Sequence, residues 1–253
     1  MIKTQIEDFF ISSNSVSDIP EEEYQKVGLL IDTFEALSRV VYQSLYIIDY
    51  NKKNFLYVSN NPLFLCGLTT QEVKKMGYAF YLNHVPEQEQ TMLTELNIAG
   101  FGFFENLSVQ ERTQCTMSYD FHLVSGRKKT LINHKLTPTL LTKEGRIWLA
   151  ACVVSLSSHS TPGNIVLRIT GQPVSYEYSL KSHRWKENEG ISLSEREKEV
   201  LLLSAQGYSM NEIADRLCLG SDSIKFHRKN VFEKLQVKNI TEALSFATNY
   251  KLL

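Results

Sequence analysis

The sequence predicts an α+β domain, built on an antiparallel sheet with flanking helices, followed by a small all-α domain of four helices. Two observations lead to this fold class. Apolar residues recur at helical spacing in several stretches before residue 100, with two short strand patterns among them, and from residue 118 they alternate with polar residues, as in strands. From residue 192 the chain instead carries three helix start signals at short intervals. A length of 253 residues is sufficient for two such domains.

The composition is that of an ordinary globular protein, with 43% hydrophobic and 22% charged residues and a formal net charge of −1. We expect no signal peptide, because the first residues contain no apolar run. We also expect no membrane span, because the longest apolar run, residues 147–154, is far shorter than the roughly 20 residues required. The four cysteines lack CxxC or CxxH spacing, which disfavours a zinc site and a disulfide framework. A reducing cytoplasm is the expected location.

In the first domain, helices and short strands are expected before the long strands. Apolar residues at three- and four-residue steps predict the first helix, and polar turns separate the strands. Pro86 suits a first helical turn, and Gly100 lies beyond the expected end of that helix. The predicted elements are helices over residues 21–43, 61–75 and 86–98 and short strands over residues 45–50 and 55–59.

Three long strands are expected next. Alternation begins at Ser118 and continues to the turn at Ser125 and Gly126. A second strand is predicted over residues 129–137. A third, over residues 147–156, is apolar without interruption at its start, which is typical of a strand covered on both faces.

This order of elements resembles a PAS domain over residues 25–157. The run Tyr57–Asn61 is similar to the family's junction between strand and helix, and Asn83–Glu89 is similar to its His-Pro-acid turn with the histidine displaced. The resemblance implies a sensor domain, and a different α+β sensor-like domain is the alternative. Residues 1–24 would then form an N-terminal extension.

Residues 158–190 are expected to form a hairpin and a linker. Strand patterns over residues 164–170 and 174–180 flank a turn at residues 171–173. An isolated hairpin is marginally stable, so it should pack on the preceding sheet, on the following helices or on a second subunit. Residues 181–190 are polar apart from Trp185 and are predicted to link the domains.

The C-terminal region carries the three helix start signals. Each pairs a capping side chain with a glutamate three residues on: Ser194 with Glu197, Ser209 with Glu212, and Asn239 with Glu242. Gly207 suits the end of the first helix, where a positive φ is common. Apolar stripes give each helix a buried face. Ala214 is small enough for two helices to cross closely.

Residues 191–253 resemble a LuxR-type helix-turn-helix domain. The matching runs are Ser192–Leu201, Ala205–Ser209, Glu212–Ala214, Ser223–His227 and Lys234–Val237. The resemblance implies that the helix over about residues 222–235 enters the major groove of double-stranded DNA.

Seven residues are implied as the DNA-binding site. Those implied to face base edges are Lys225, Phe226 and Lys229. Those implied to meet phosphates are Ser223, Arg228, Lys234 and Lys238. Residues 221–238 contain five Lys or Arg against two acidic residues, a local charge of +3 in a nearly neutral chain, as expected for DNA binding. His227 could contact a phosphate or face the core of the domain, and the structural role is favoured.

The sequence also departs from the family pattern. Gly220 replaces a capping serine, so Ser221 is expected to take over as the cap and shift the helix start. Asn211 replaces a lysine that touches phosphate, and Ile240 replaces a polar residue. The last helix, over about residues 241–250, is implied to form the dimer contact through Leu244 and Ala247.

The signal received by the first domain is left open among a small ligand, a protein partner and a domain that mainly dimerises. A receiver domain and a flavin photosensor lack their required residues, and an acyl-homoserine-lactone domain fits the order of elements less well than a PAS domain. The candidate haem ligand, His84, lies in a predicted turn, so no cofactor is expected. Aromatic residues are candidates for a ligand pocket, although such residues more often form plain core. They are Phe64, Tyr78, Phe80, Tyr81, Phe101, Phe103 and Phe104.

The sequence therefore predicts a cytoplasmic transcriptional regulator that senses a ligand or partner and binds DNA as a homodimer. The alternative is a protein-interaction module whose helix-turn-helix contacts RNA polymerase or another regulator. An enzyme is not expected, since paired carboxylates, a nucleophile with its base, a phosphate loop and a metal cluster are all missing from the sequence.

Overall fold

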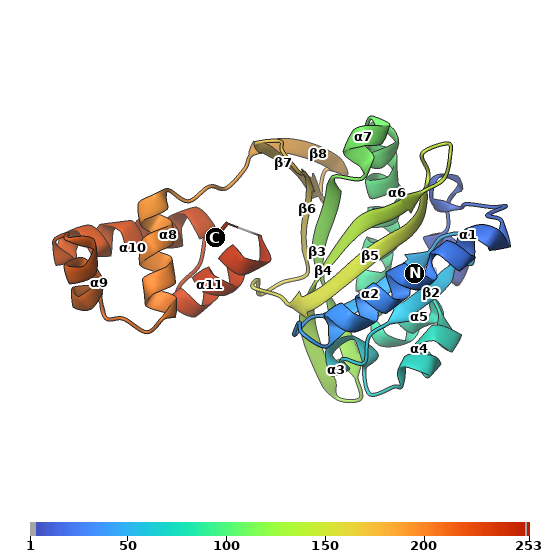
Figure 1. The fold of residues 1–253 in the computed structure, drawn as a ribbon, viewed down its shortest axis with the longest axis horizontal. Helices are drawn as coiled ribbons and strands as arrows, with labels where there is room; N and C mark the ends of the chain where they lie inside the picture. Colours follow the sequence, from blue (N-terminus) through green and yellow to red (C-terminus); the bar gives the residue numbers. More distant parts are fainter. Residues whose placement is uncertain (1–3, 251) are drawn as a thin grey trace. The chain divides into compact units, whose positions relative to one another are not determined.

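The computed structural model describes residues 4–250 and 252–253, and it divides the chain into two compact units. Unit 1 covers residues 1–188 and unit 2 covers residues 189–253 (Figure 1). The predicted fold class is confirmed: unit 1 contains an antiparallel sheet with helices, and unit 2 contains helices alone among its described residues. No helix in the described residues has the length and apolar character needed to cross a membrane.

Unit 1 is built on one eight-stranded sheet in the order β2-β1-β5-β4-β3-β6-β7-β8. Neighbouring strands from β2 to β7 pair antiparallel. The strands are β1 Ser44–Asp49, β2 Asn54–Val58, β3 Cys115–Ser125, β4 Lys128–Leu141, β5 Ile147–Leu156, β6 Gly163–Ile169, β7 Val174–Ser179 and β8 Arg184–Glu189.

Helices cover both faces of this sheet at its β1–β5 end (Figure 1). The predicted two-sided burial of β5 is confirmed, because Cys152 lies in the main core and Leu149 packs in the cluster on the other face. The helices of unit 1 are α1 Glu21–Lys26, α2 Gly28–Ser38, α3 Pro62–Leu65, α4 Thr70–Met76, α5 Ala79–His84, α6 Glu87–Glu105 and α7 Val109–Arg112.

Two predicted helices are interrupted. The helix expected over residues 21–43 is α1 followed by α2, which meet at the fully buried Val27, and α2 ends at Ser38. The helix expected over residues 61–75 breaks at Cys66 and Gly67, whose φ angles of 53° and 89° are left-handed and end α3. Periodicity alone does not reveal such a break, because the apolar spacing resumes on the next helix.

The N-terminal segment belongs to unit 1 and is not a separate extension. Two 3₁₀ helices, η1 Ile6–Phe9 and η2 Ser12–Asn14, carry Phe9 and nearby Val16 into the main core. Phe9 is 2% exposed, and its carbonyl accepts hydrogen bonds from the side chains of Asn14 at 2.8 Å and Asn97 at 3.0 Å. Asn97 lies on α6, so the expected boundary at residue 24 does not separate the segment from the core.

The predicted hairpin is present as β6 and β7, and it packs on the sheet of unit 1 through pairing of β6 with β3. The linker predicted over residues 181–190 is wrong for most of its length, because β8 occupies residues 184–189. The indole Nε1 of Trp185 donates to the carbonyl of Ala99 on α6 at 3.2 Å, which fixes this edge strand. Its other side chains are largely exposed, so the strand has the polar composition of a linker.

Unit 2 consists of α8 Glu195–Ala205, α9 Met210–Leu217, α10 Ser221–Leu235 and α11 Ile240–Asn249. All three predicted start signals are formed. The N–H groups of Ser194 and Ser209 each donate to the glutamate three residues on, at 2.8 Å, and Asn239 accepts from the N–H of Glu242 at 2.9 Å. Gly207 has φ of +88° just beyond α8, as expected.

Candidate nucleic-acid interface

A buried stripe fixes the orientation of α10 within unit 2. Ile224, Val231 and Leu235 are 0–2% exposed. Ile224 packs with Val200 of α8 and Ile213 of α9 in one apolar cluster. Because these three positions on α10 face inward, the opposite side of the helix faces solvent.

The start of α10 differs from the prediction. Gly220 is the N-cap, with φ of −71° and no side-chain cap bond, and the helix begins at Ser221. The expectation that Ser221 would replace Gly220 as the cap is therefore wrong. Cys218 ends α9 in a left-handed conformation, and the N–H of Leu219 donates to the carbonyl of Ala214 at 2.9 Å. This bond and the left-handed conformation of Cys218 form a tight turn between α9 and α10. No described side chain caps the start of α10.

The three residues implied to face base edges lie together on the outward face of α10. Lys225, Phe226 and Lys229 are all exposed, and 60% of Phe226 is accessible. Lys225 pairs with Asp222 at 2.8 Å and Lys229 with Glu233 at 3.5 Å. Exposed pairs of this kind contribute little free energy, so both ammonium groups can exchange their carboxylate for another acceptor.

Cations also line a hollow on the α10 surface, about 470 Å³ in volume. Met210 at the start of α9 forms part of this hollow, and Lys225, Arg228 and Lys229 contribute the positive charge. The guanidinium of Arg228 lies 5.2 Å from the ring centre of Phe232, which lines the same hollow. The predicted phosphate-binding Arg228 is thus held beside the predicted base-facing lysines.

Two other residues implied to meet phosphates lie at the ends of α10. Ser223 is in the first turn, where its N–H donates to the carbonyl of Gly220 at 3.0 Å. Lys238 follows α10 and is exposed, and among the described residues its ammonium forms no ion pair. The half-buried His227 lies edge-on to Phe226, with ring centres 5.8 Å apart.

Lys234 has a partner inside unit 2 that the sequence did not reveal. Its Nζ lies 2.7 Å from Oε2 of Glu197, whose side chain is only 4% exposed. Burial by itself raises the pKa of Glu197, but hydrogen bonds from Lys234 and Ser194 outweigh it and lower the pKa. The phosphate contact of Lys234 stays a prediction, and its ion pair fastens α10 to the start of α8.

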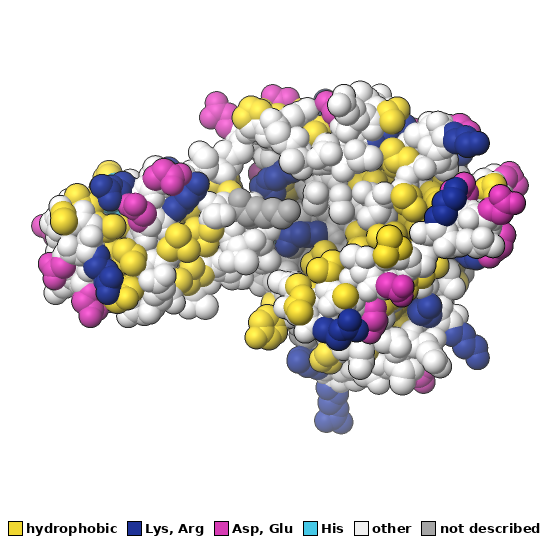
Figure 2. Space-filling model, in the orientation of Figure 1, with side chains coloured by type: hydrophobic (Ala, Val, Ile, Leu, Met, Phe, Trp, Pro, Cys, Tyr) yellow, Lys and Arg dark blue, Asp and Glu magenta, His cyan; other side chains and the backbone are white. Residues whose placement is uncertain are grey.

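Figure 2 shows no separation of charge on the visible face of unit 2, where Lys and Arg side chains are interspersed with Asp and Glu. The expected dimer residues of α11 differ in burial. Leu244 is half-buried, whereas Ala247 is completely buried inside unit 2. The expectation that Ala247 forms a dimer contact is therefore wrong.

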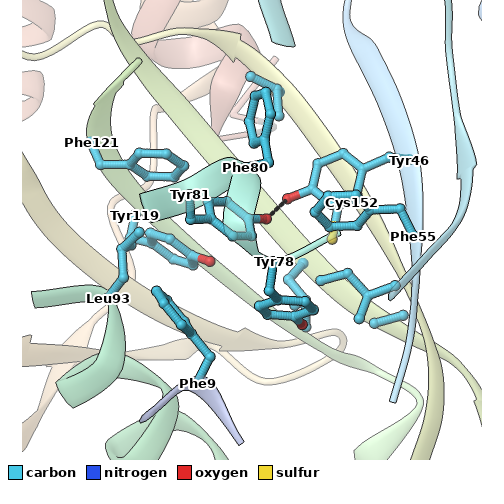
Figure 3. Packing of buried hydrophobic residues seen from close by; sticks show 14 of the residues in the cluster. Phe9, Tyr46, Phe55, Tyr78, Phe80, Tyr81, Leu93, Tyr119, Phe121 and Cys152 are labelled. Atoms are coloured by element: carbon cyan, nitrogen blue, oxygen red, sulfur yellow. Dashed lines mark hydrogen bonds between the residues drawn. The ribbon is translucent and has the colours of Figure 1, made fainter. Parts of the chain in front are cut away.

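In unit 1, a polar group lies inside the aromatic core (Figure 3). The hydroxyl of Tyr46 forms a hydrogen bond with that of Tyr81 at 2.6 Å. The same hydroxyl lies 2.5 Å from Nε2 of His134. His134 is 1% exposed, and its Nδ1 has no hydrogen-bond partner among the described residues. Burial, with a smaller contribution from Lys135, lowers the pKa of His134 to about 3, so the ring is neutral at physiological pH.

The aromatic residues named as pocket candidates mostly fill this core. Phe64 and Phe80 are fully buried, with ring centres 4.7 Å apart. Phe103 instead packs against a separate apolar cluster on β3 and β6 and contacts Trp185, with ring centres 5.2 Å apart. A small apolar hollow of about 20 Å³, room for about one water molecule, lies between α6 and strands β3 to β6.

A second buried polar group was not anticipated. Asp120 is completely buried and accepts hydrogen bonds from Asn133 at 2.8 Å and Asn164 at 2.9 Å, and its Oδ2 lies 2.5 Å from Nδ1 of His159. These bonds tie the loop after β5 to strands β3, β4 and β6. In the described part of the chain, no three His, Cys, Asp or Glu side chains are grouped to hold a metal ion.

Short capped helices, a tight turn and one helix with an exposed cationic face define unit 2 as a helix-turn-helix domain. Residues 191–247 match the family described as "Bacterial regulatory proteins, luxR family". Unit 2 is therefore a LuxR-family helix-turn-helix domain, as the sequence runs implied.

Relatives agree with this assignment over a limited length. The probable csgAB operon transcriptional regulatory protein of Salmonella typhimurium is 40% identical over 68 residues, which is 27% of this chain and 32% of that protein. Response regulator protein VraR of Staphylococcus aureus is 41% identical over 61 residues, 24% of this chain and 29% of its own. The match thus spans about a third of the length of these curated relatives.

Two solved structures align along most of the chain. The phage VqmA–DPO complex covers 92% of both chains at 15% identity with a TM-score of 0.33. The Vibrio cholerae VqmA dimer covers 88% of both chains at 13% identity, also with a TM-score of 0.33. Similarity at this level assigns no function to unit 1.

Proposed function

We propose that this chain is a sequence-specific, DNA-binding transcriptional regulator that acts in the cytoplasm. The observation that supports the proposal is the outward face of α10, where Lys225, Phe226 and Lys229 are exposed together on a LuxR-family domain. In this arrangement the two lysines donate to base edges while Arg228 and Lys238 meet phosphates.

The first test selects duplexes from random DNA and measures affinity by fluorescence anisotropy at several salt concentrations. Lys225→Ala with Lys229→Ala should abolish preference for the selected site. Lys238→Ala should weaken binding to all duplexes and reduce the slope of log affinity against log salt by about 0.9. Lys198→Ala is the matched control, because that lysine lies on α8 and pairs with Glu195 at 3.0 Å. Unchanged site preference in the double variant contradicts the role of α10.

The protein-interaction alternative predicts a different outcome. If no duplex binds in a salt-dependent manner at low ionic strength, the exposed face of α10 contacts a protein such as RNA polymerase instead. The two functions are separated by this measurement because electrostatic attraction to phosphate gives every DNA-binding domain a salt-dependent non-specific affinity.

We further propose a homodimer that binds an inverted repeat, since paired recognition helices reach half-sites about one helical turn apart. The half-buried Leu244 supports a contact through α11, whereas the buried Ala247 is excluded from it. Leu244→Lys should increase the protein concentration needed to occupy both half-sites, while binding to an isolated half-site is retained. Light scattering of the protein–DNA complex measures the number of subunits bound.

The role proposed for unit 1 is that of a PAS-like sensor domain for a small ligand. The polar group formed by Tyr46, Tyr81 and His134 supports this role, because the buried Nδ1 of His134 has no hydrogen-bond partner within residues 4–250 and 252–253. Native mass spectrometry of protein purified from cells should detect a bound small molecule, and Tyr46→Phe should reduce its occupancy. If extracts rich in metabolites change neither mass nor thermal stability, sensing by a protein partner is favoured.

A further inference from the structure

Phe226 is an exposed aromatic residue with no role in the core of unit 2. It is 60% accessible, whereas the apolar stripe of α10 is 0–2% accessible. Among the described residues, its ring contact is with the neighbouring His227, whose ring centre lies 5.8 Å away. This exposed phenyl ring, on a helix whose outward face is otherwise charged, is available for contact with a partner of that face.

The base edges of the major groove limit what the phenyl ring of Phe226 can recognise there. In the major groove, guanine, adenine and cytosine present hydrogen-bond donors or acceptors, and thymine alone adds an apolar group, the 5-methyl. A phenyl ring neither donates nor accepts a conventional hydrogen bond. Contact with a purine or cytosine edge would leave polar base atoms without partners, whereas contact with thymine buries apolar surface on both sides.

The neighbours of Phe226 complete a pattern of recognition. Lys225 precedes it and Lys229 lies one turn further along the same exposed face. Lysine ammonium groups donate to O6 and N7 of guanine. The carboxylates of Asp222 and Glu233 hold these lysines in the free protein without burying them. In this pattern one apolar side chain lies between two hydrogen-bond donors.

We propose that Phe226 selects thymine at one position of each half-site through its 5-methyl group, flanked by guanines that Lys225 and Lys229 contact. This inference rests on the proposed function, because it assumes that α10 enters the major groove.

The experiment replaces each thymine of a selected duplex by deoxyuridine, one at a time. This change removes a single methyl and leaves every hydrogen-bonding group of the base pair in place. For the unmodified protein, one thymine per half-site should lose about fourfold in affinity, which corresponds to the burial of one methyl group. All affinities are measured by anisotropy at one salt concentration.

Two variants assign the methyl effect to a residue. With Phe226→Ala, thymine and deoxyuridine should bind equally at that position. With the control variant Lys225→Ala, overall affinity should fall while the ratio of thymine to deoxyuridine affinity is retained. Phe226 is exposed, so its replacement should leave the unfolding temperature unchanged, and a thermal melt checks this.

The possible failures are distinguishable. Binding that is specific but insensitive to every deoxyuridine replacement overturns the thymine inference and leaves the proposed function intact. A methyl effect that persists in Phe226→Ala also overturns the inference, since another residue then reads the methyl. Failure to bind any duplex overturns the proposed function itself.

Discussion

Replacement of Lys234 by methionine distinguishes a structural role of this lysine from a phosphate contact. Methionine retains an apolar stem of similar reach but lacks the ammonium group. Glu197, with its side chain 4% exposed, then keeps its bond from the N–H of Ser194 at 2.8 Å and loses the ion pair at 2.7 Å. A buried carboxylate is left with one fewer partner, so unit 2 should be less stable.

The size of the expected loss of stability follows from the burial of Glu197 and Lys234. Breaking a fully buried ion pair costs about 3–5 kcal/mol. The side chain of Lys234 is 44% exposed, and solvent screening therefore reduces the cost of breaking this pair to about 2 kcal/mol. Because about 1.4 kcal/mol corresponds to a factor of ten, local opening of α8 and α10 should become about thirtyfold more frequent.

Amide hydrogen exchange followed by mass spectrometry measures this opening in the full chain, peptide by peptide. Peptides from α8 and α10 should exchange faster in Lys234→Met, and those from unit 1 should be unchanged. Lys238→Met is the matched control, because its ammonium has no ion pair among the described residues. Exchange at the unmodified rate in Lys234→Met would refute the contribution assigned to the pair.

The pH dependence provides an independent check. The pKa of Glu197 in the folded protein is below its ordinary value of 4.5. The carboxylate therefore contributes stability that is fully present above pH 4.5 and is lost as the pH falls through the lower folded-state pKa. In Lys234→Met this acid-dependent loss should be smaller, because the ion pair that lowers the pKa is gone.

Three further changes test unit 1. Phe9→Ala removes a ring that contacts Tyr78 and Tyr81 in the core, so urea unfolding followed by tryptophan fluorescence should show a loss of about 3–5 kcal/mol; an unchanged midpoint would mean that residues 4–24 are a separate extension. Because His134 is neutral and buried, unit 1 should lose stability as the pH falls from 6.5 towards 3, since the unfolded state binds the proton first. The effect is measured as the difference in unfolding free energy between this protein and His134→Phe across that pH range. Parallel curves of unfolding free energy against pH would exclude it. Trp185→Ala should accelerate exchange in β8 while α4 keeps its rate, and equal protection of β8 would show that the indole does not anchor the strand.

Elements with a continuous local signal could be predicted from the sequence. The caps of α8, α9 and α11 depend on side chains three residues apart, and β5 is recognised from its own apolar run. The exposed face formed by Lys225, Phe226 and Lys229 follows in the same way once the buried stripe of α10 is known. Each of these features is determined by neighbours within one or two helical turns.

Features that depend on distant residues could not be predicted. Phe9 is buried by side chains about seventy residues further along the chain, and the short η1 segment has no periodicity that signals burial. Glu197 and Lys234 are 37 residues apart in the chain. The capping box already explained why a glutamate stands at position 197, so nothing in the sequence pointed to a second partner. β8 has the composition of a linker because an edge strand with mostly exposed side chains needs few apolar residues.

Gly100 can be interpreted either as the end of α6 or as a packing residue within it. Gly100 lies beyond the end at residue 98 that the sequence predicts for this helix, where a glycine is typical of a C-terminal cap. In the structure α6 continues to Glu105, and a Cβ on Gly100 would lie 2.8 Å from Sδ of Met117 on β3. A side chain at residue 100 would displace the flexible end of Met117, so the glycine lets the Met117 side chain pack directly against α6. Because the helix continues, Phe103 and Ala99 reach Trp185 of β8, so the unpredicted final turns of α6 hold the unpredicted last strand.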